Sequence, residues 1–335
     1  MIDRIHTDVL IVGTGMAGLM AAHSLTEQHI NVLLVEKNPC VGGRLATAEI
    51  GGGLADSGAQ FFTVRNSQFK VFVDRWRDHG LVFEWAQGWS DGSLNSAPFD
   101  RHPRYAVRGG MTALAGYLAA GLDICLDTPL TMISLNGDGW LVQDDQGHTM
   151  STSALLLTPP VPLSLNLLNA GQVVLSARDR ETLEALSYDP CVVGLFSVDG
   201  KVRLPEPGAI QRPNAPISWI ADNRRKGLSP DTTVITVHAS AAYSRAIWSR
   251  PDWEVLVALE NALREFKDSS ASVIERHLQR WLYSVPVHPY PNRYLHSINL
   301  PSLVFAGDSF GSPRVEGAAL SGLAASKALV ATLTG

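Results

Sequence analysis

Short runs of consecutive apolar residues, bounded by glycine turns, define the start of the chain. The first run covers Asp8–Val12, the glycine-rich segment Gly13–Gly18 comes directly after it, and Leu19–Gln28 is rich in Ala, Leu and Met. A second run, Asn31–Val35, ends at Glu36. Runs of this length bounded by turns are typical of buried strands, and the Ala- and Leu-rich stretch is typical of a helix. The pattern therefore predicts strand, turn, helix and strand in this order.

The rest of the chain gives a second set of elements. Apolar residues at helical spacing predict helices over 67–79, 111–120 and 252–266, two short helices within 162–186, and a long helix opened by Ser312-Pro313. The helix over 252–266 places Trp253, Leu256, Leu259 and Leu263 on one apolar face. Strands are predicted at 81–85, 122–125, 154–157, 191–198, 217–221, 233–238, 273–282 and 302–306, with a three-stranded meander over 131–151, two small strands around 51–53 and a loop over 208–216.

These elements predict an α/β fold class with two domains. Helices alternate with strands at the start of the chain and again at its end, which indicates a Rossmann-like domain that is discontinuous in sequence. The middle strands lack regular helical alternation, which indicates a mixed or antiparallel α+β domain. We place the first domain at 1–66, 104–162 and 295–335, and the second at 67–103 and 163–294.

The glycine-rich segment has the G-x-G-x-x-G spacing of a dinucleotide-binding turn. Gly13 would allow the tight turn out of the strand, Gly15 would let a pyrophosphate approach the backbone, and Gly18 would let the helix pack close to the strand. The start of the helix offers free N–H groups to phosphates. Glu36, at the end of the second strand, can accept hydrogen bonds from both hydroxyls of an adenosine ribose. Together these features predict dinucleotide binding.

Two further segments favour FAD over NAD as that dinucleotide. The loop Asn38–Arg44 carries two glycines and an arginine; in flavoproteins of the glutathione-reductase type such a loop returns under the pyrophosphate, where Arg44 would add a charge-assisted contact. Near the other end, Gly307-Asp308 precedes the long helix, whose surface carries Gly317 and Ala318. A bare helix start aimed at the flavin would stabilise the charge of the reduced ring. The alternatives are an ordinary glycine turn and a tightly packed internal helix.

The segment Asp56–Phe62 joins a glycine turn, an amide and two aromatic rings. This combination suits the wall of a site for a planar ring, but a core turn with buried phenylalanines has the same residue types. Residue type alone leaves both interpretations open.

Composition and charge exclude several classes of protein. The chain has 335 residues and a formal net charge of −5 with no basic tract, so nucleic acid is not an expected partner. Its three cysteines form no C-x-x-C pair, which excludes a disulfide reductase and a cysteine zinc site, and no metal is predicted. We find no signal peptide and no apolar run long enough to span a membrane, so we expect a cytoplasmic protein with no membrane contact.

Taken together, these segments resemble the renalase family, in its bacterial form, within the flavin amine oxidase superfamily of glutathione-reductase-type FAD proteins. The resemblance covers nearly the whole chain. It is carried by Gly13–Gly18, Gly42–Arg44, Asp56–Phe62, Gly110-Met111, Trp219, Asn223-Arg224, His238-Ala239, Arg280–Tyr283, Gly307-Asp308, Arg314–Gly317 and Leu320–Gly322.

The resemblance implies an activity. A non-covalent FAD would accept hydride at flavin N5 from misreduced dihydro isomers of NAD(P)H, the 2- or 6-dihydro forms, giving NAD(P)+. Dioxygen would reoxidise the flavin and form hydrogen peroxide. Such chemistry needs positioned rings more than acid–base groups.

Candidate residues follow for both ligands. For the substrate wall they are Gln60, Phe62, Tyr105, His238 and Trp281. For FAD they are Gly13, Gly15, Met16, Ala17, Gly18, Glu36, Lys37, Gly43, Arg44, Gly58, Ala59, Gln60, Phe61, Gly307, Asp308, Gly317 and Ala318. His238 can bind a carboxamide or ribose, or be a satisfied polar residue at a strand end; Trp281 can belong to the core. Arg224, Arg225 and Lys226 can meet substrate phosphates, although a solvated loop is the simpler expectation.

Three other functions stay open at this stage. The first is an amine oxidase. Many flavin amine oxidases carry a lysine hydrogen-bonded through water to flavin N5. The candidates Lys201, Lys226 and Lys267 do not lie in convincing apolar strands, which argues against this function. A flavin-dependent isomerase or desaturase is a second possibility. A protein that binds FAD without turnover is a third, although a complete second domain argues against it.

Overall fold

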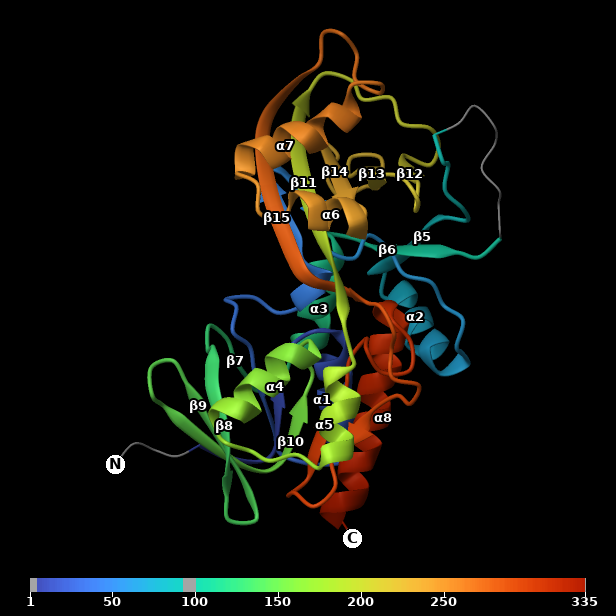
Figure 1. Cartoon of the computed structure of the whole chain (residues 1–335). Coiled ribbons are helices and arrows are strands. Elements are labelled where there is room, and N and C mark those ends of the chain that lie inside the picture. Colours follow the sequence, from blue (N-terminus) through green and yellow to red (C-terminus); the bar gives the residue numbers. More distant parts are fainter. Residues whose placement is uncertain (1–4, 93–100, 335) are drawn as a thin grey trace. The chain divides into compact units, whose positions relative to one another are not determined.

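The computed structural model describes residues 5–92 and 101–334, which form two compact units (Figure 1). The first comprises Met1–Gly43, Ala115–Ser187 and Val285–Gly335. The second comprises Arg44–Leu114 and Tyr188–Ser284. Within the described residues, no helix combines the length and apolar character needed to cross a membrane.

A mostly parallel sheet forms the centre of the first unit. Its main path runs in the order β16 (Leu295–His296), β17 (Leu303–Phe305), β10 (Thr149–Leu157), β1 (Ile5–Val12), β2 (Val32–Val35) and β7 (Ile124–Cys125). The pairs β17–β10, β10–β1, β1–β2 and β2–β7 are parallel, and β16 is antiparallel to β17. All four residues of β2 are buried, as expected where helices cover both faces of a parallel sheet.

Strand β10 differs from its prediction. The sequence suggested two strands, the last of the meander and a separate run over 154–157, but the structure has one continuous strand. Its first residues pair antiparallel with β9 (Gly139–Asp144), which in turn pairs with β8 (Leu130–Asn136), while the whole strand is parallel to β1. Burial alternates at first and then becomes continuous, and no turn residue separates the two halves. The change in periodicity marks the passage into the sheet interior.

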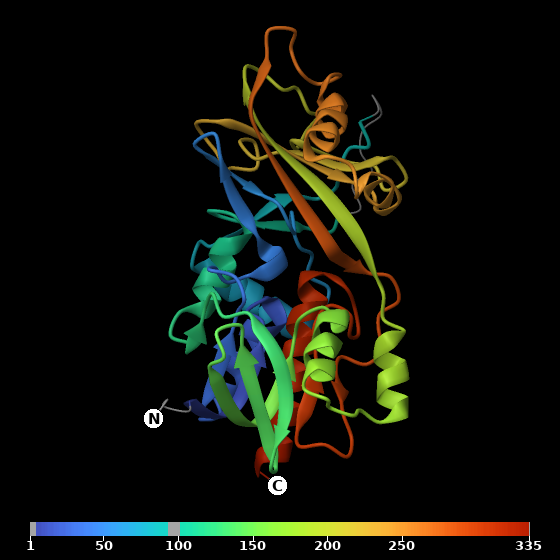
Figure 2. The same cartoon turned by 60° about the vertical axis from the view of Figure 1, so that its left-hand side comes forward.

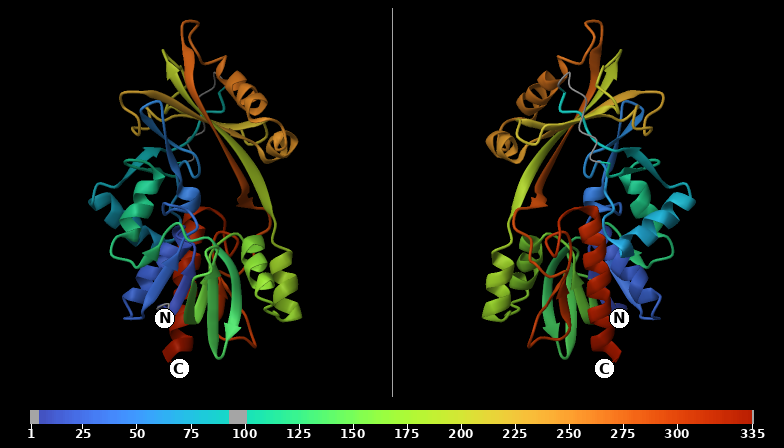
Figure 3. Two further views of the ribbon diagram at one scale, coloured as in Figure 1. Left: turned by 90° about the vertical axis from the view of Figure 1, so that its left-hand side faces the viewer. Right: turned by 90° about the vertical axis from the view of Figure 1, so that its right-hand side faces the viewer.

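Helices α1 (Met16–Thr26) and α8 (Arg314–Thr334) pack against each other in the first unit (Figure 3). A Cβ added to Gly322 of α8 would lie 2.1 Å from the carbonyl oxygen of Ala17 in α1. Helix α8 begins at Arg314, two residues after the predicted cap at Ser312. Helices α4 (Val161–Ala170) and α5 (Ala177–Glu184) confirm the two short helices predicted after Pro160.

The second unit contains a five-stranded sheet with the order β12 (Ala209–Gln211), β13 (Ile217–Asp222), β14 (Thr233–Ala239), β11 (Tyr188–Asp199) and β15 (Ser272–Pro286). The pairs β12–β13, β13–β14 and β14–β11 are antiparallel. The long strands β11 and β15 run side by side in Figure 2. Strand β12 lies inside the predicted loop over 208–216, because its three residues pair with β13 although they form too short a run to stand out.

Smaller elements complete the second unit. Two hairpins, β3 (Thr47–Ile50) with β4 (Gly53–Asp56) and β5 (Val82–Ala86) with β6 (Arg104–Val107), accompany the sheet. The helices are α2 (Ser67–Asp78), α3 (Met111–Ala119), α6 (Ala241–Ile247) and α7 (Asp252–Glu260). The fold class is confirmed: a Rossmann-like parallel sheet and a separate antiparallel sheet.

Helix α7 is shorter than predicted, and of its predicted apolar face Leu259 and Leu263 are buried whereas Trp253 is not. A 3-10 turn, Asn261–Leu263, follows it, and Trp253 is 66% exposed. The buried residues of α7 are Val255 and Leu259, four positions apart. Trp253 lies two residues before Val255, about 200° around the helix, so it points away from the core.

The predicted domain boundaries differ from the compact units. Residues 44–66 and 104–114, which we assigned to the cofactor domain, pack within the second unit, and residues 163–187 and 285–294, which we assigned to the substrate domain, pack within the first. The functional division of the chain stays a prediction.

Candidate functional site

The glycine turn lies between β1 and α1 in the first unit. Gly13 has φ +96°, a conformation that side chains disfavour, and a Cβ on Gly18 would lie 2.1 Å from the carbonyl oxygen of Gly13. A Cβ on Gly15 would meet no atom within 4 Å, so the space in front of this residue is open. Gly15 is also the N-cap of α1, without a side-chain cap and without an acidic residue in the first turn. An uncapped helix start facing open space fits the pyrophosphate of FAD.

Three strands of the sheet end beside this turn. The Thr158 hydroxyl, at the end of β10, donates to the carbonyl oxygens of Val12 (2.7 Å) and Gly13 (3.3 Å). At the end of β17, a Cβ on Gly307 would lie 3.5 Å from the carbonyl oxygen of Thr158. The structure thus brings Gly307 next to the glycine turn, at the carboxyl ends of the strands, where open α/β sheets bind their ligands.

Glu36 follows β2 and is 5% exposed. Its Oε2 accepts hydrogen bonds from the backbone N–H (3.0 Å) and hydroxyl (2.8 Å) of Thr14, and its Oε1 accepts from the backbone N–H (3.1 Å) and side-chain amide (2.7 Å) of Asn38. These four bonds fix the carboxylate beside the glycine turn. Since they also use most of its acceptor sites, a ribose would have to share or replace some of them.

The other predicted FAD residues divide between the two units. Gly43 returns to the glycine turn, where its Cβ would lie 3.9 Å from the Gly15 Cα. The remaining ones in the first unit are Met16 and Ala17 in the first turn of α1, exposed Lys37, partly buried Asp308, and Gly317 and Ala318 near the start of α8. The second unit holds Arg44, Gly58, Ala59, Gln60 and Phe61. Arg44 donates to the carbonyl oxygens of Tyr283 (3.2 Å) and Ser284 (3.1 Å).

A buried ion pair lies at the centre of a polar network in the second unit. Lys226 and Asp56 have fully buried side chains, and Lys226 Nζ lies 2.5 Å from Asp56 Oδ2. The same ammonium donates to the carbonyl oxygen of Gln60 (2.6 Å) and lies 4.9 Å from the centre of the Trp85 ring. Burial lowers the pKa of Lys226, and the Asp56 carboxylate opposes that shift. The other oxygen of Asp56 accepts from Met111 N (2.8 Å), at the start of α3.

Gln60 connects this pair to two residues of the sheet. Its Oε1 accepts from the indole N–H of Trp219 (3.2 Å), and its Nε2 lies 3.3 Å from His238 Nε2. Burial, and after it the nearby charge of Lys226, lower the pKa of His238 to about 3. His238 is therefore neutral at physiological pH.

The aromatic wall candidates have different surroundings. Phe62 is 3% exposed, stacks on Tyr105 with ring centres 5.7 Å apart, and makes edge contacts with Phe69 and Trp76. These contacts make Phe62 part of an aromatic core. Trp281 donates its indole N–H to the carbonyl oxygen of Ser57 (2.8 Å). Of the five wall candidates, Gln60 and His238 meet directly, and Phe62 and Tyr105 form a separate pair.

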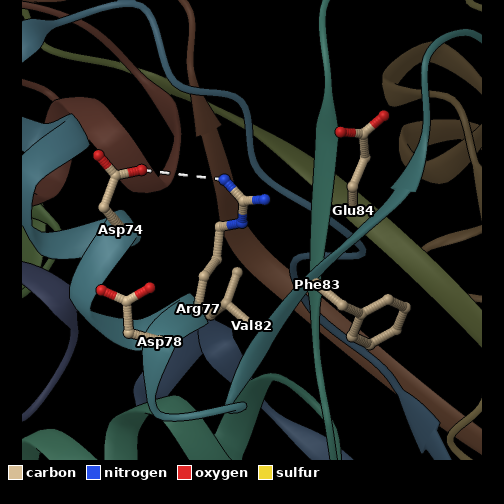
Figure 4. A pocket seen from close by; sticks show the side chains of 6 residues that line it. All are labelled: Asp74, Arg77, Asp78, Val82, Phe83 and Glu84. Carbon is tan, nitrogen blue, oxygen red and sulfur yellow. Dashed lines mark ion pairs between the residues drawn. The ribbon is translucent and has the colours of Figure 1, made fainter.

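A hollow of about 400 Å³ lies elsewhere in the second unit (Figure 4). Side chains of α2 and β5 line it, among them Asp74 and Arg77, which are 3.9 Å apart. No predicted site residue lines this hollow.

Sequence reasoning missed Lys226 and Trp219 as parts of the network. The segment 224–226 was expected to be a solvated loop, and that expectation is wrong for Lys226, which is 1% exposed, whereas Arg224 is exposed. Its neighbour Arg225 pairs with Glu206. Nothing in the local sequence distinguishes the three cations, because the partners of Lys226 come from a distant segment.

Comparison with known proteins identifies the class. Residues 92–330 match the family model for flavin containing amine oxidoreductases, and residues 11–76 match that for an NAD(P)-binding Rossmann-like domain. The chain belongs to the flavin containing amine oxidoreductase family, and its cofactor is FAD, as predicted.

Individual proteins with similar sequences add detail to this family assignment. The chain is 26% identical over 350 residues to renalase of Mus musculus, covering 96% of this chain and 98% of that protein. It is 48% identical over 54 residues to a putative flavin-containing monoamine oxidase of Mycobacterium tuberculosis, covering 16% of this chain and 12% of that one. The predicted resemblance to renalase is confirmed at this identity, and the predicted place in the flavin amine oxidase superfamily is confirmed as well.

Solved structures show the same fold. Putrescine oxidase bound to putrescine has a TM-score of 0.71 at 15% identity, covering 98% of this chain and 100% of that one. A putative protoporphyrinogen oxidase from Exiguobacterium sp. 255-15 has a TM-score of 0.72 at 13% identity, covering 97% and 99%.

Proposed function

We propose that this flavin-dependent oxidoreductase oxidises misreduced dihydro isomers of NAD(P)H, the 2- or 6-dihydro forms, to NAD(P)+, and that dioxygen is the final electron acceptor and gives hydrogen peroxide. The resemblance to renalase along 96% of the chain supports this assignment. When bound, FAD supplies a two-electron acceptor that can take a hydride and pass electrons to dioxygen.

The observation that carries the proposal is that the Lys226 ammonium is already bound within the protein. Of the three lysines considered for an amine oxidase, only Lys226 is fully buried, and its ammonium is already bound by Asp56 and Gln60. Asp56 and Gln60 take two of the three N–H donors of this lysine and the Trp85 ring lies 4.9 Å away, so a water molecule for amine chemistry would be left with the third donor alone. What remains in the network is neutral: the Gln60 amide, the Trp219 indole and the imidazole of His238.

These neutral residues suit a substrate that can release hydride without losing a proton to the protein. In a dihydropyridine, the lone pair of the ring nitrogen drives the departure of hydride from the ring carbon, so no catalytic base is needed. The residues of the second unit would bind and orient the ring, which is the larger part of such catalysis. In the first unit, the glycine turn and Glu36 would hold the pyrophosphate and ribose of a non-covalent FAD.

The test is anaerobic mixing of the holoenzyme with borohydride-generated NADH isomers, followed by simple amines. We expect the isomers to bleach the flavin absorbance in a single turnover, and admitted oxygen to restore it with formation of hydrogen peroxide. Ordinary 4-dihydro NADH is the matched control. Bleaching by amines but not by the isomers would replace this proposal with an amine oxidase.

A further inference from the structure

The orientation of the Gln60 amide is fixed by three neighbours. Its Nε2 donates to the carbonyl oxygens of Asp56 (2.6 Å) and Gly58 (3.1 Å), and its Oε1 accepts from the indole N–H of Trp219. A flipped amide would place oxygen against two carbonyl oxygens and an NH₂ group against an N–H. The hydrogen-bond network therefore assigns the amide unambiguously.

This orientation decides which nitrogen of His238 carries the proton. The amide nitrogen that faces His238 Nε2 at 3.3 Å is a donor and has no lone pair to offer. A protonated His238 Nε2 would face this NH₂ group with no acceptor between them, whereas an unprotonated Nε2 can share one of the two amide hydrogens that also bond to Asp56 and Gly58, so Nε2 is unprotonated. A neutral imidazole carries its single proton on the other nitrogen, Nδ1. In the described part of the chain, His238 Nδ1 has no hydrogen-bond partner.

Lys226 keeps the Gln60 segment in place. It joins the side chain of Asp56 to the backbone of Gln60, the two ends of the turn that carries the amide. The hydroxyl of Thr236, which lies two residues before His238 on β14, donates to the carbonyl oxygen of Asp56 (3.1 Å). The turn and the strand that holds the imidazole are thus bound to each other by buried contacts.

We infer that His238 is held as the neutral Nδ1–H tautomer and that this N–H is a specificity determinant, donating to a hydrogen-bond acceptor on the substrate, the carboxamide oxygen of the dihydronicotinamide ring. The identity of that acceptor rests on the proposed function. A fixed donor also disfavours an ammonium group, which has only N–H donors to present. The depressed pKa of His238 keeps the arrangement neutral in the presence of the Lys226 charge.

The first test observes the tautomer directly. Histidine-selective ¹⁵N NMR of the holoenzyme, with the His238 signals assigned by their loss in His238→Gln, should give a protonated Nδ1 and an unprotonated Nε2 from pH 8 to pH 5. In Gln60→Leu, which removes the donor, Nε2 should become at least partly protonated. The control Gln87→Leu removes an exposed glutamine that bonds to Glu84 and should leave the signals unchanged. A protonated Nε2 in the native enzyme, or an imidazole that titrates near its ordinary pKa, would overturn the inference.

The second test measures recognition. Binding of NAD+ is compared with that of the analogue carrying unsubstituted pyridinium, in the native holoenzyme and in His238→Phe. Loss of the carboxamide should weaken binding to the native protein by about three- to tenfold, the range for one neutral hydrogen bond, and by clearly less in His238→Phe. Equal losses in both proteins would refute the recognition role.

The inference and the proposed function can fail separately. Failure to oxidise dihydronicotinamide isomers would remove the proposed function and leave the tautomer result standing. Oxidation of the isomers combined with a protonated Nε2 would refute only the inference.

Discussion

Replacing Lys226 with methionine should strongly destabilise the second unit. The substitution keeps the length of the side chain but removes the ammonium that Asp56 and Gln60 bind. Asp56 would then be a buried carboxylate that keeps its bonds to Met111 N and to the hydroxyl of Thr47 (2.6 Å) but has no counter-charge. Removing one partner of a buried ion pair costs about 3–5 kcal/mol, mostly because the other charge is left unpaired.

The double variant separates this effect from lost packing. In Lys226→Met with Asp56→Asn, the asparagine oxygen can still accept from Met111 and Thr47, and no buried charge remains. We expect the double variant to be more stable than Lys226→Met alone by about 2 kcal/mol or more, because neutralising a buried pair costs far less than breaking it.

The assay is urea unfolding of the flavin-free protein followed by tryptophan fluorescence. Of the eight tryptophans, all except Trp140 lie in the second unit, so the signal reports chiefly on that unit. The control is Lys70→Met, which removes an exposed ion pair with Asp74 on α2 and should change the free energy of unfolding by less than about 1 kcal/mol. If Lys226→Met lowers the free energy of unfolding no more than this control does, the ion pair does not hold the network as described. The same conclusion follows if adding Asp56→Asn to Lys226→Met restores none of the lost free energy.

Three further predictions concern the first unit and the free thiols. Glu36→Ala should weaken FAD binding by about 1.5–3 kcal/mol, the range for hydrogen bonds to a charged group, in a fluorescence titration of the flavin-free protein. Gly322→Ala should lower the free energy of unfolding by about 1–3 kcal/mol, because the new methyl would overlap the Ala17 carbonyl of α1. A thiol reagent at pH 8 should modify exposed Cys40 rapidly and Cys191 only after unfolding, because burial raises the pKa of Cys191 to about 12.

Each of the three has its own control. Glu27→Ala removes an exposed acid at the end of α1 and should leave FAD affinity unchanged; an equal loss would show that Glu36 is not at the ribose. Gly116→Ala adds a methyl to α3 where no atom lies within 4 Å and should stabilise by about 0.5–1 kcal/mol, so a similar gain in Gly322→Ala would contradict the close packing of α1 and α8. Fast labelling that persists in Cys40→Ser would contradict the assignment of the reactive thiol.

Local sequence predicted the first strand, glycine turn, helix and second strand of the first unit well because the information for them is local. The strand, glycine turn, helix and acid follow one another along the chain, and Gly13 and Gly18 have a steric reason visible in the structure, whereas Gly15 faces open space. The long helix α8 was also predicted, and its small residues do allow a close approach, which at Gly322 is to α1. The predicted start of β10 was wrong because the continuity of a strand depends on its neighbouring strands and not on its own residue pattern.

The polar network of the second unit could be predicted only in part. Gln60 and His238 were chosen by residue type, and the structure brings them into contact. Lys226 was missed because its ion pair spans 170 positions of the chain, and a lysine beside two arginines has the sequence signature of a solvated turn. Its burial is set by the sheet and by Asp56, which no local window contains.

The packing of α1 against α8 has a consequence for biosynthesis. The hydroxyls of Ser24 and Ser326, which meet across these helices at 2.8 Å, are 302 positions apart. At about 5–20 residues per second, a ribosome needs roughly 15–60 s to pass from one to the other. For most of that interval α1 lacks the helix that packs against it, and once it has left the ribosome its apolar surface is available to chaperones and to aggregation. The first unit can therefore complete this packing only after α8 has been made, long after the glycine turn.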